Sequence, residues 1–160
     1  MKLVIQRVKS ASIEVEGKTI SEIGLGILVL LGVTTSDTEK EADFLVEKLA
    51  KLRIMARLPS PEGEANGGQG ENDKKMNYSI RDVGGEMLIV SQFTLYGDTK
   101  GGNRPSFIKA ARPEIAKPLY DYFIEKVKAQ KISVQTGQFG ADMKIKALLD
   151  GPVTIILEQG

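Results

Sequence analysis

The strongest constraint on the fold is the run from Ile23 to Val33, in which three glycines are the only residues without an apolar side chain. A strand with one face in water alternates apolar and polar residues, whereas this run has no polar position. The sequence therefore predicts a strand that is buried on both faces. Gly24, Gly26 and Gly32 are suited to a bulge or to the close approach of another backbone.

Two other segments have the spacing of amphipathic helices. Apolar residues recur every three or four positions from Asp37 to about Leu52, and again from Ile115 to Val127. Ser36 is expected to cap the first helix, with Glu39 bonding back to it. About seven strands are expected around them, at 2–15 (one strand or a pair), 23–33, 53–57, 86–94, from 134 onwards, 143–149 and 153–157. These elements predict a mixed α/β fold in a single domain, residues 1–160, with both helices on one face of a sheet.

Composition excludes several kinds of chemistry. The 160 residues include no histidine and no cysteine, and the net charge is +1. Serine–histidine and cysteine–histidine nucleophiles, zinc sites with thiolate or imidazole ligands, and disulfides are therefore excluded. No metal or cofactor is expected. The most apolar run is too short to cross a bilayer and wrongly placed for a signal peptide, so a cytoplasmic protein without membrane contact is expected.

The segment from Pro59 to Lys75 differs from the rest of the chain. It holds four glycines and two prolines and few apolar residues. Such a composition predicts a solvated loop insertion rather than a boundary between domains.

Two short motifs carry polar or unusual backbone groups next to apolar runs. Ser91-Gln92-Phe93-Thr94 follows the apolar run that ends at Val90, and Gly151-Pro152 precedes the last apolar run. From these residues alone, Thr94 is a nucleophile, a positioning group or simply a β-branched residue that suits a strand end, although no base is evident to activate it. Ser91 and Gln92 could equally bond within their own loop. Gly151-Pro152 by itself is typical of a tight turn.

Together with five further motifs, these residues resemble the D-aminoacyl-tRNA deacylase family, also called D-tyrosyl-tRNA deacylases. The resemblance spans nearly the whole chain in order. The motifs are Gln6-Arg7-Val8, the run Gly24 to Val33, Lys75-Met76-Asn77, Ser91 to Leu95, Arg104-Pro105-Ser106-Phe107, Gly137 to Met143 and Asp150 to Thr154. Two features depart from the family pattern: the 59–75 insertion exceeds the usual hairpin, and Leu149 stands where the family has asparagine before Asp-Gly-Pro.

The resemblance implies a fold and an activity. The fold would be a three-layer β/β/α sandwich that works as a homodimer. The activity would be proofreading: hydrolysis of the ester that joins a D-amino acid, or mischarged glycine, to tRNA, which releases the free amino acid and tRNA. Backbone amides of Phe93 and Thr94 would hold the reacting carbonyl, and the substrate's own 2′-hydroxyl would take part in catalysis.

The resemblance also implies roles for residues outside the Ser91–Thr94 motif. A cis Gly151–Pro152 peptide would reach into the partner's site and exclude L-amino acids by a steric clash. Arg7 would brace this peptide, whereas its position in an apolar strand by itself indicates a snorkelling edge residue. Phe139 and Met143 would lie near the substrate, although their spacing alone indicates ordinary core residues.

Two alternatives remain open on the sequence. The chain could be a non-catalytic module that binds RNA or a small molecule on the same fold, resembling the editing-domain scaffold of archaeal threonyl-tRNA synthetases. A binder of that kind has no need for both the Ser-Gln-Phe-Thr and the Gly-Pro motifs. The basic segment from Lys100 to Arg112 is either an ordinary solvated face or a place where tRNA phosphates bind.

Overall fold

The computed structural model describes residues 1–56 and 75–160, so the predicted insertion lies outside the described residues except for Lys75. Within these described residues, two α-helices and one 3-10 helix accompany six strands. The strands are β1 (Lys2–Val15), β2 (Lys18–Ile23), β3 (Gly26–Gly32), β4 (Glu86–Ser91), β5 (Ser133–Thr136) and β6 (Lys144–Glu158), and the helices are α1 (Glu39–Ala50), η2 (Phe93–Tyr96) and α2 (Pro113–Ala129). No helix among these residues is long and apolar enough to span a membrane.

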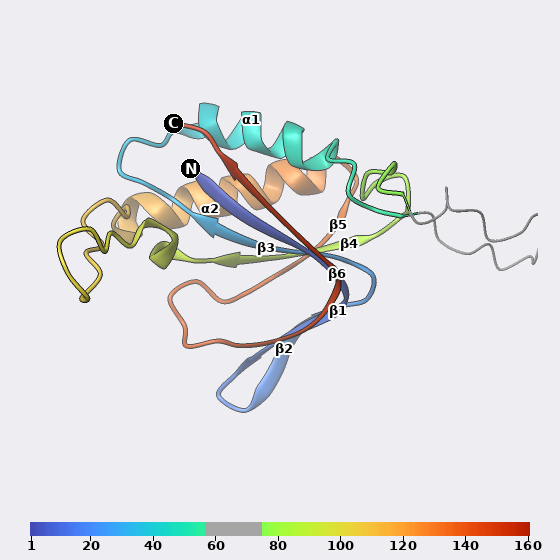
Figure 1. Cartoon of the computed structure of the whole chain (residues 1–160), viewed down its shortest axis with the longest axis horizontal. Helices are drawn as coiled ribbons and strands as arrows, with labels where there is room; N and C mark the ends of the chain where they lie inside the picture. Colours follow the sequence, from blue (N-terminus) through green and yellow to red (C-terminus); the bar gives the residue numbers. More distant parts are fainter. Residues whose placement is uncertain (57–74) are drawn as a thin grey trace, which may run out of the picture.

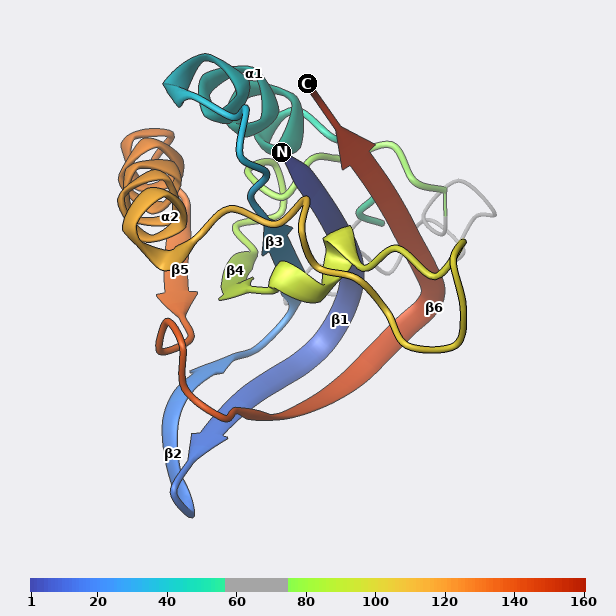
Figure 2. The ribbon, with the colours of Figure 1, turned by 90° about the vertical axis from the view of Figure 1, so that its left-hand side faces the viewer.

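The strands form one sheet that bends back on itself. Its order is β2-β1-β3-β4-β5, and β6 pairs with the other side of β1. Strands β3, β4 and β5 are mutually parallel, whereas β1 is antiparallel to β2, β3 and β6. Bulges between Gln6 and Ser10 allow β1 to curve, so its second half leaves β3 and pairs with β2 (Figure 2). Ser21 of β2 then donates to the Thr136 carbonyl of β5 at 2.5 Å, which nearly closes the sheet into a barrel.

Two hydrophobic cores separate three layers. The larger core lies between the sheet and the helices α1 and α2, which cover the same face (Figure 1). The smaller core lies on the opposite face of β3 and β4, where Leu28, Leu88 and Val90 meet Val8 and Ile13 from the curved part of β1. Strand β3 is therefore buried on both faces, as its apolar sequence predicts. The observed architecture confirms the expected mixed α/β fold with β/β/α layers.

The first helix begins two residues later than predicted. Thr38, not Ser36, caps α1: its hydroxyl accepts from the Lys40 amide, and Glu41 completes the capping box through the Thr38 amide at 2.8 Å. Asp37 is instead buried, where it forms an ion pair with the amino group of Met1 and accepts from the Thr34 amide at 2.7 Å. The tertiary contact of Asp37 therefore decides where the helix starts.

Three strand predictions were wrong in detail. The described part of the predicted strand 53–57, residues 53–56, forms only an isolated bridge between Met55 and Tyr78. The ranges 143–149 and 153–157 form one strand, β6, because β1 pairs with it along almost its whole length. Strand β4 ends at Ser91 rather than Thr94, because the chain turns there into the 3-10 helix η2.

Candidate active site

A cavity of about 610 Å³ opens at the carboxyl ends of the three parallel strands β3, β4 and β5. This is the edge of an α/β sheet where ligands usually bind, and the volume suits a small molecule. Its wall is mostly apolar. The lining residues are Leu31, Val33, Val90, Ser91, Gln92, Phe93, Phe107, Ala110, Ala111, Arg112, Pro113, Ala116, Tyr120, Phe139, Gly140, Ala141, Asp142, Met143 and Ile145.

The sheet positions the segment from Ser91 to Phe93 on the cavity wall. Ser91 is the last residue of β4, and the Gln92 amide still donates to the Leu31 carbonyl of β3 at 2.7 Å. The chain then turns into η2, which places the Phe93 ring against Phe107 with ring centroids 5.1 Å apart in an edge-to-face arrangement. Phe93 nevertheless keeps 57% of its surface exposed, so one chain alone leaves this wall open to solvent.

Two neighbouring backbone donors lie in the same segment. Within the described part of the chain, the amides of Phe93 and Thr94 donate no hydrogen bond, because they open η2 and have no carbonyl one turn earlier to bond to. The Thr94 hydroxyl is engaged, since it accepts a hydrogen bond from the Gln92 side chain. Adjacent free amides are the groups that stabilise a carbonyl oxygen as it gains negative charge.

Helix α2 closes the other side of the cavity with Tyr120, which is not among the residues predicted from the sequence. Its hydroxyl donates to the Ile89 carbonyl at 2.8 Å, and its ring lies 5.8 Å from that of Phe139. Burial raises the pKa of Tyr120 far above its ordinary value, so the phenol stays protonated and serves as a fixed donor. The sequence did hold a signal for Tyr120, because it is an aromatic residue with a polar end on the predicted buried face of an amphipathic helix.

Arg112 and Asp142 are the charged residues on the cavity wall, and both are exposed. Neither was singled out as a site residue from the sequence, although Arg112 ends the basic segment that begins at Lys100 and Asp142 lies within the Gly137–Met143 motif. No group of three or more carboxylates is placed to hold a metal ion in residues 1–56 and 75–160. Apart from these two charged side chains, the described site is made of backbone amides, hydroxyls and apolar surface.

Arg7 lies in the central strand β1 and is only 9% exposed, so its interpretation as a snorkelling edge residue is wrong. Its Nε lies 2.9 Å from a carboxylate oxygen of Asp150, and its Nη1 donates to the Ile54 carbonyl at 2.8 Å. Arg7 thereby holds the residue immediately before Gly151-Pro152.

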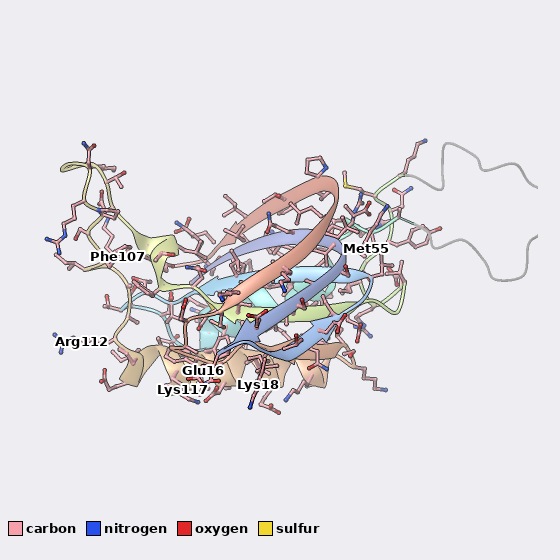
Figure 3. All side chains as sticks on the ribbon, turned by 90° about the horizontal axis from the view of Figure 1, so that it is seen from below. Glu16, Lys18, Met55, Phe107, Arg112 and Lys117 are labelled. Atoms are coloured by element: carbon pink, nitrogen blue, oxygen red, sulfur yellow. The ribbon has the colours of Figure 1, made fainter. Side chains whose placement is uncertain are left out.

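The peptide bond between Gly151 and Pro152 is cis, and both residues are exposed in the single chain. They do not line the cavity. Arg7 links them to Ile54, the neighbour of Met55, and Figure 3 shows Met55 at the end of the molecule opposite to Phe107, which lines the cavity.

The residues predicted from the sequence therefore fall into two groups. The structure brings five of them together on the cavity wall: Ser91, Gln92, Phe93, Phe139 and Met143. Thr94 does not line the cavity itself but directly follows Phe93 in the chain. Arg7, Gly151 and Pro152 form a separate group away from the cavity of their own chain.

Comparison with known proteins gives one consistent family. The family model described as D-Tyr-tRNA(Tyr) deacylase matches residues 4–158. Proteins named D-aminoacyl-tRNA deacylase from Fusobacterium nucleatum and Pelobacter propionicus are 51% and 50% identical, each over 99% of this chain and over 95% and 100% of their own lengths.

Two solved structures have the same fold. One, titled c-Myc DNA Unwinding Element Binding Protein, has a TM-score of 0.85 at 39% identity and covers 100% of this chain and 99% of its own. The other, titled as an analysis of a probable eukaryotic D-amino acid tRNA deacylase, has a TM-score of 0.77 at 19% identity, which supports the fold alone, and covers 98% and 97%. Family model, relatives and fold agree over almost every residue: the chain belongs to the D-aminoacyl-tRNA deacylase family.

Proposed function

We propose that this protein hydrolyses the ester between a D-amino acid, or glycine, and the terminal ribose of tRNA. The observation that carries the proposal is the pair of free amides at Phe93 and Thr94 beside a cavity of about 610 Å³. The family relatives support the same substrate, since aminoacyl-tRNA is what their names say they act on. Such a proofreading enzyme acts where tRNA is charged and used, in the cytoplasm.

The chemistry needs little from the protein. Water attacks the ester carbonyl, the tetrahedral oxyanion accepts hydrogen bonds from the amides of Phe93 and Thr94, and the carbon–oxygen bond to ribose then breaks. The attacking water loses a proton, the leaving ribose oxygen gains one, and the free amino acid and tRNA are released. The vicinal ribose hydroxyl is suited to relay this proton, because it lies beside the leaving oxygen and the chain has no histidine to do so. One oxyanion donor contributes about 3–4 kcal/mol to the barrier reduction, so positioning and two amides supply a large share.

The proposal includes a homodimer in which Gly151-Pro152 of one protomer completes the site of the other. Edge strand β6 supports this, because it presents Leu148, Leu149 and Ile156 with 59%, 43% and 63% of their surfaces exposed. The exposed Phe93 and the exposed Gly151-Pro152 segment lie at opposite ends of one chain, an arrangement that a two-fold axis can bring together. Rigid carbonyls next to the substrate Cα would then exclude an L side chain while admitting D or glycine.

Hydrolysis of D-tyrosyl-tRNA, glycyl-tRNA and L-tyrosyl-tRNA by the purified protein tests the function. We expect turnover of the first two and little of the third. Binding of all three without release of amino acid would instead support the alternative of a non-catalytic binding module.

Thr94→Ala is expected to keep measurable activity, within about tenfold of the parent protein. The substitution removes the hydroxyl that accepts from Gln92 but leaves the backbone amide, which the proposed mechanism uses. Single-turnover hydrolysis of D-tyrosyl-tRNA measures the rate, and mass spectrometry of the quenched reaction looks for an acyl-enzyme. An ester trapped on Thr94 would show that its hydroxyl is the nucleophile and would contradict the proposed attack by water.

Metal removal is expected to leave the rate unchanged. The proposed mechanism places the developing charge on amides, and residues 1–56 and 75–160 hold no cluster of carboxylates for a cation. Activity on D-tyrosyl-tRNA is measured after exhaustive dialysis against EDTA, with the tRNA refolded separately in magnesium. Loss of activity that returns with a stoichiometric divalent cation would contradict the mechanism.

A further inference from the structure

Residues 98–112, which lie between η2 and α2, concentrate positive charge at one end of the molecule; we call this segment the basic loop. It contains Lys100, Arg104, Lys109 and Arg112 but only one carboxylate, Asp98, in a chain of 22 basic and 21 acidic side chains. The remaining sequence is therefore slightly negative. In Figure 1 the loop projects beyond the sheet on the side where β4 ends, and Figure 2 shows it from that side, in front of β1 and β6.

The basic loop is held in place at its base. Asp98 and Ser106 exchange two backbone hydrogen bonds of 2.8 Å, and Lys109 pairs with Asp98 at 3.1 Å. Phe107 packs on Phe93, and the Ala111 amide donates to the Val33 carbonyl at 2.9 Å. The loop is thus anchored to the cavity wall, so charges on it have a defined position relative to the site.

Three of its cations are not neutralised. Lys100, Arg104 and Arg112 are exposed, and within the described residues none of them forms an ion pair. In contrast, four lysines in or next to the helices each form an ion pair with a carboxylate. These pairs are Lys51–Glu47, Lys117–Asp121, Lys126–Asp43 and Lys128–Glu125. Exposed arginines and lysines without a carboxylate partner are what a polyanion binds most readily.

The basic loop also connects two cavities. Phe107 and Arg112 line the large cavity, whereas Lys2, Lys100 and Lys109 line a second one of about 330 Å³ together with Asp98 and Glu158. Glu158 pairs with Lys2 and Asp98 with Lys109, so Lys100 is the lysine of this cavity without an ion pair among the described residues. A chain of phosphates that leaves the large cavity along the loop therefore passes the unpaired Arg112 and then the unpaired Lys100. Figure 3 shows Phe107 and Arg112 at this same end of the molecule.

We propose that the basic loop binds the phosphates of the nucleotides next to the esterified 3′ end of tRNA, with Lys100 and Arg104 as the contacts farthest from the ester. This inference rests on the proposed function, because it assumes that the ester lies in the large cavity. Contacts to phosphate do not depend on the base sequence, so they fit an enzyme that accepts many tRNAs. They also place the affinity for tRNA outside a cavity whose wall is mostly apolar.

The test compares a phosphate-bearing and a phosphate-free substrate in the variant Lys100→Gln/Arg104→Gln. With D-tyrosyl-tRNA we expect KM to rise about tenfold near 0.1 M salt with kcat unchanged, and the slope of log KM against log salt to fall by about 1.5, as for two lost phosphate contacts. With the D-tyrosyl ester of adenosine, which has no phosphate, we expect no change in either constant.

Lys128→Gln is the matched control. It removes one exposed cation from the last turn of α2, about 24 Å along the helix from Arg112 at 1.5 Å per residue. The inference about the loop is overturned if the parent protein hydrolyses both substrates and the double variant keeps the KM and salt slope of this control. If the parent protein hydrolyses neither of the two D-tyrosyl esters, the proposed function is overturned instead.

Discussion

Replacing Gly151 with alanine is expected to lower the rate of D-tyrosyl-tRNA hydrolysis by about 100-fold or more, while the protein still folds. Gly151 has a φ of +129°, a value that residues with a Cβ atom rarely adopt. A Cβ there would lie 2.7 Å from Val153 Cγ2 and 2.8 Å from the Val153 amide nitrogen, so the backbone must move. The proposed dimer places this segment next to the substrate of the partner protomer, where a shift of about 1 Å is enough for such a loss.

The same substitution is expected to cost only about 1–3 kcal/mol of stability, because the strain is local and the position is exposed. For a chain of this size that lowers Tm by roughly 3–10 °C. Steady-state hydrolysis and thermal unfolding of the same preparation separate the two effects. Gly24→Ala is the control, since its Cβ would meet only a carboxylate oxygen of Glu86 at 3.7 Å. A fully active Gly151→Ala protein would mean that the Gly-Pro segment is only a turn.

Gly26→Ala is expected to have the largest effect on folding, a loss of at least about 4 kcal/mol. Gly26 is buried and pairs with Glu86 of the neighbouring parallel strand β4. A Cβ at this position would lie 1.9 Å from the Glu86 carbonyl oxygen and 2.8 Å from its carbonyl carbon. Because both atoms belong to the backbone of a central strand, no rotamer change can relieve the overlap, and β3 and β4 must separate.

Urea unfolding of the soluble fraction, together with its yield, measures this loss. Gly24→Ala again serves as the control, two residues earlier in the same chain, and is expected to remain within about 1 kcal/mol of the parent protein. A Gly26→Ala protein with parent-like stability would contradict the close approach of β3 and β4 at this register.

The predictions from the sequence succeeded where a local pattern has one physical meaning. The apolar run around Ile27–Leu31 is confirmed as a strand buried on both faces, because no solvated strand tolerates so many apolar side chains. The helical spacing likewise located α1 and α2. Boundaries were less predictable: Ser36 and Thr38 are both acceptable caps, and only the burial of Asp37 against the amino terminus selected Thr38.

The candidate site shows the same division. The motif at Ser91–Thr94 was evident as polar residues after an apolar strand, but the free amides exist only because the chain turns into η2 directly after β4. Tyr120 was missed because its spacing alone marks it as one core residue among several on α2. Its role follows from a contact with Ile89, which lies 31 positions away in the sequence.

By itself, the sequence limited the chemistry and indicated the fold class. A chain without histidine or cysteine is left with carboxylates, lysines, tyrosines, hydroxyls, backbone amides and its substrate, and apolar periodicity predicts a mixed sheet with helices packed on it. Only the tertiary structure decided which residues meet. The bend in β1 puts Arg7 against Asp150 and holds Gly151-Pro152 away from the cavity of its own chain. Such contacts join residues more than a hundred positions apart, and no local pattern encodes them, because they depend on how the whole sheet curves.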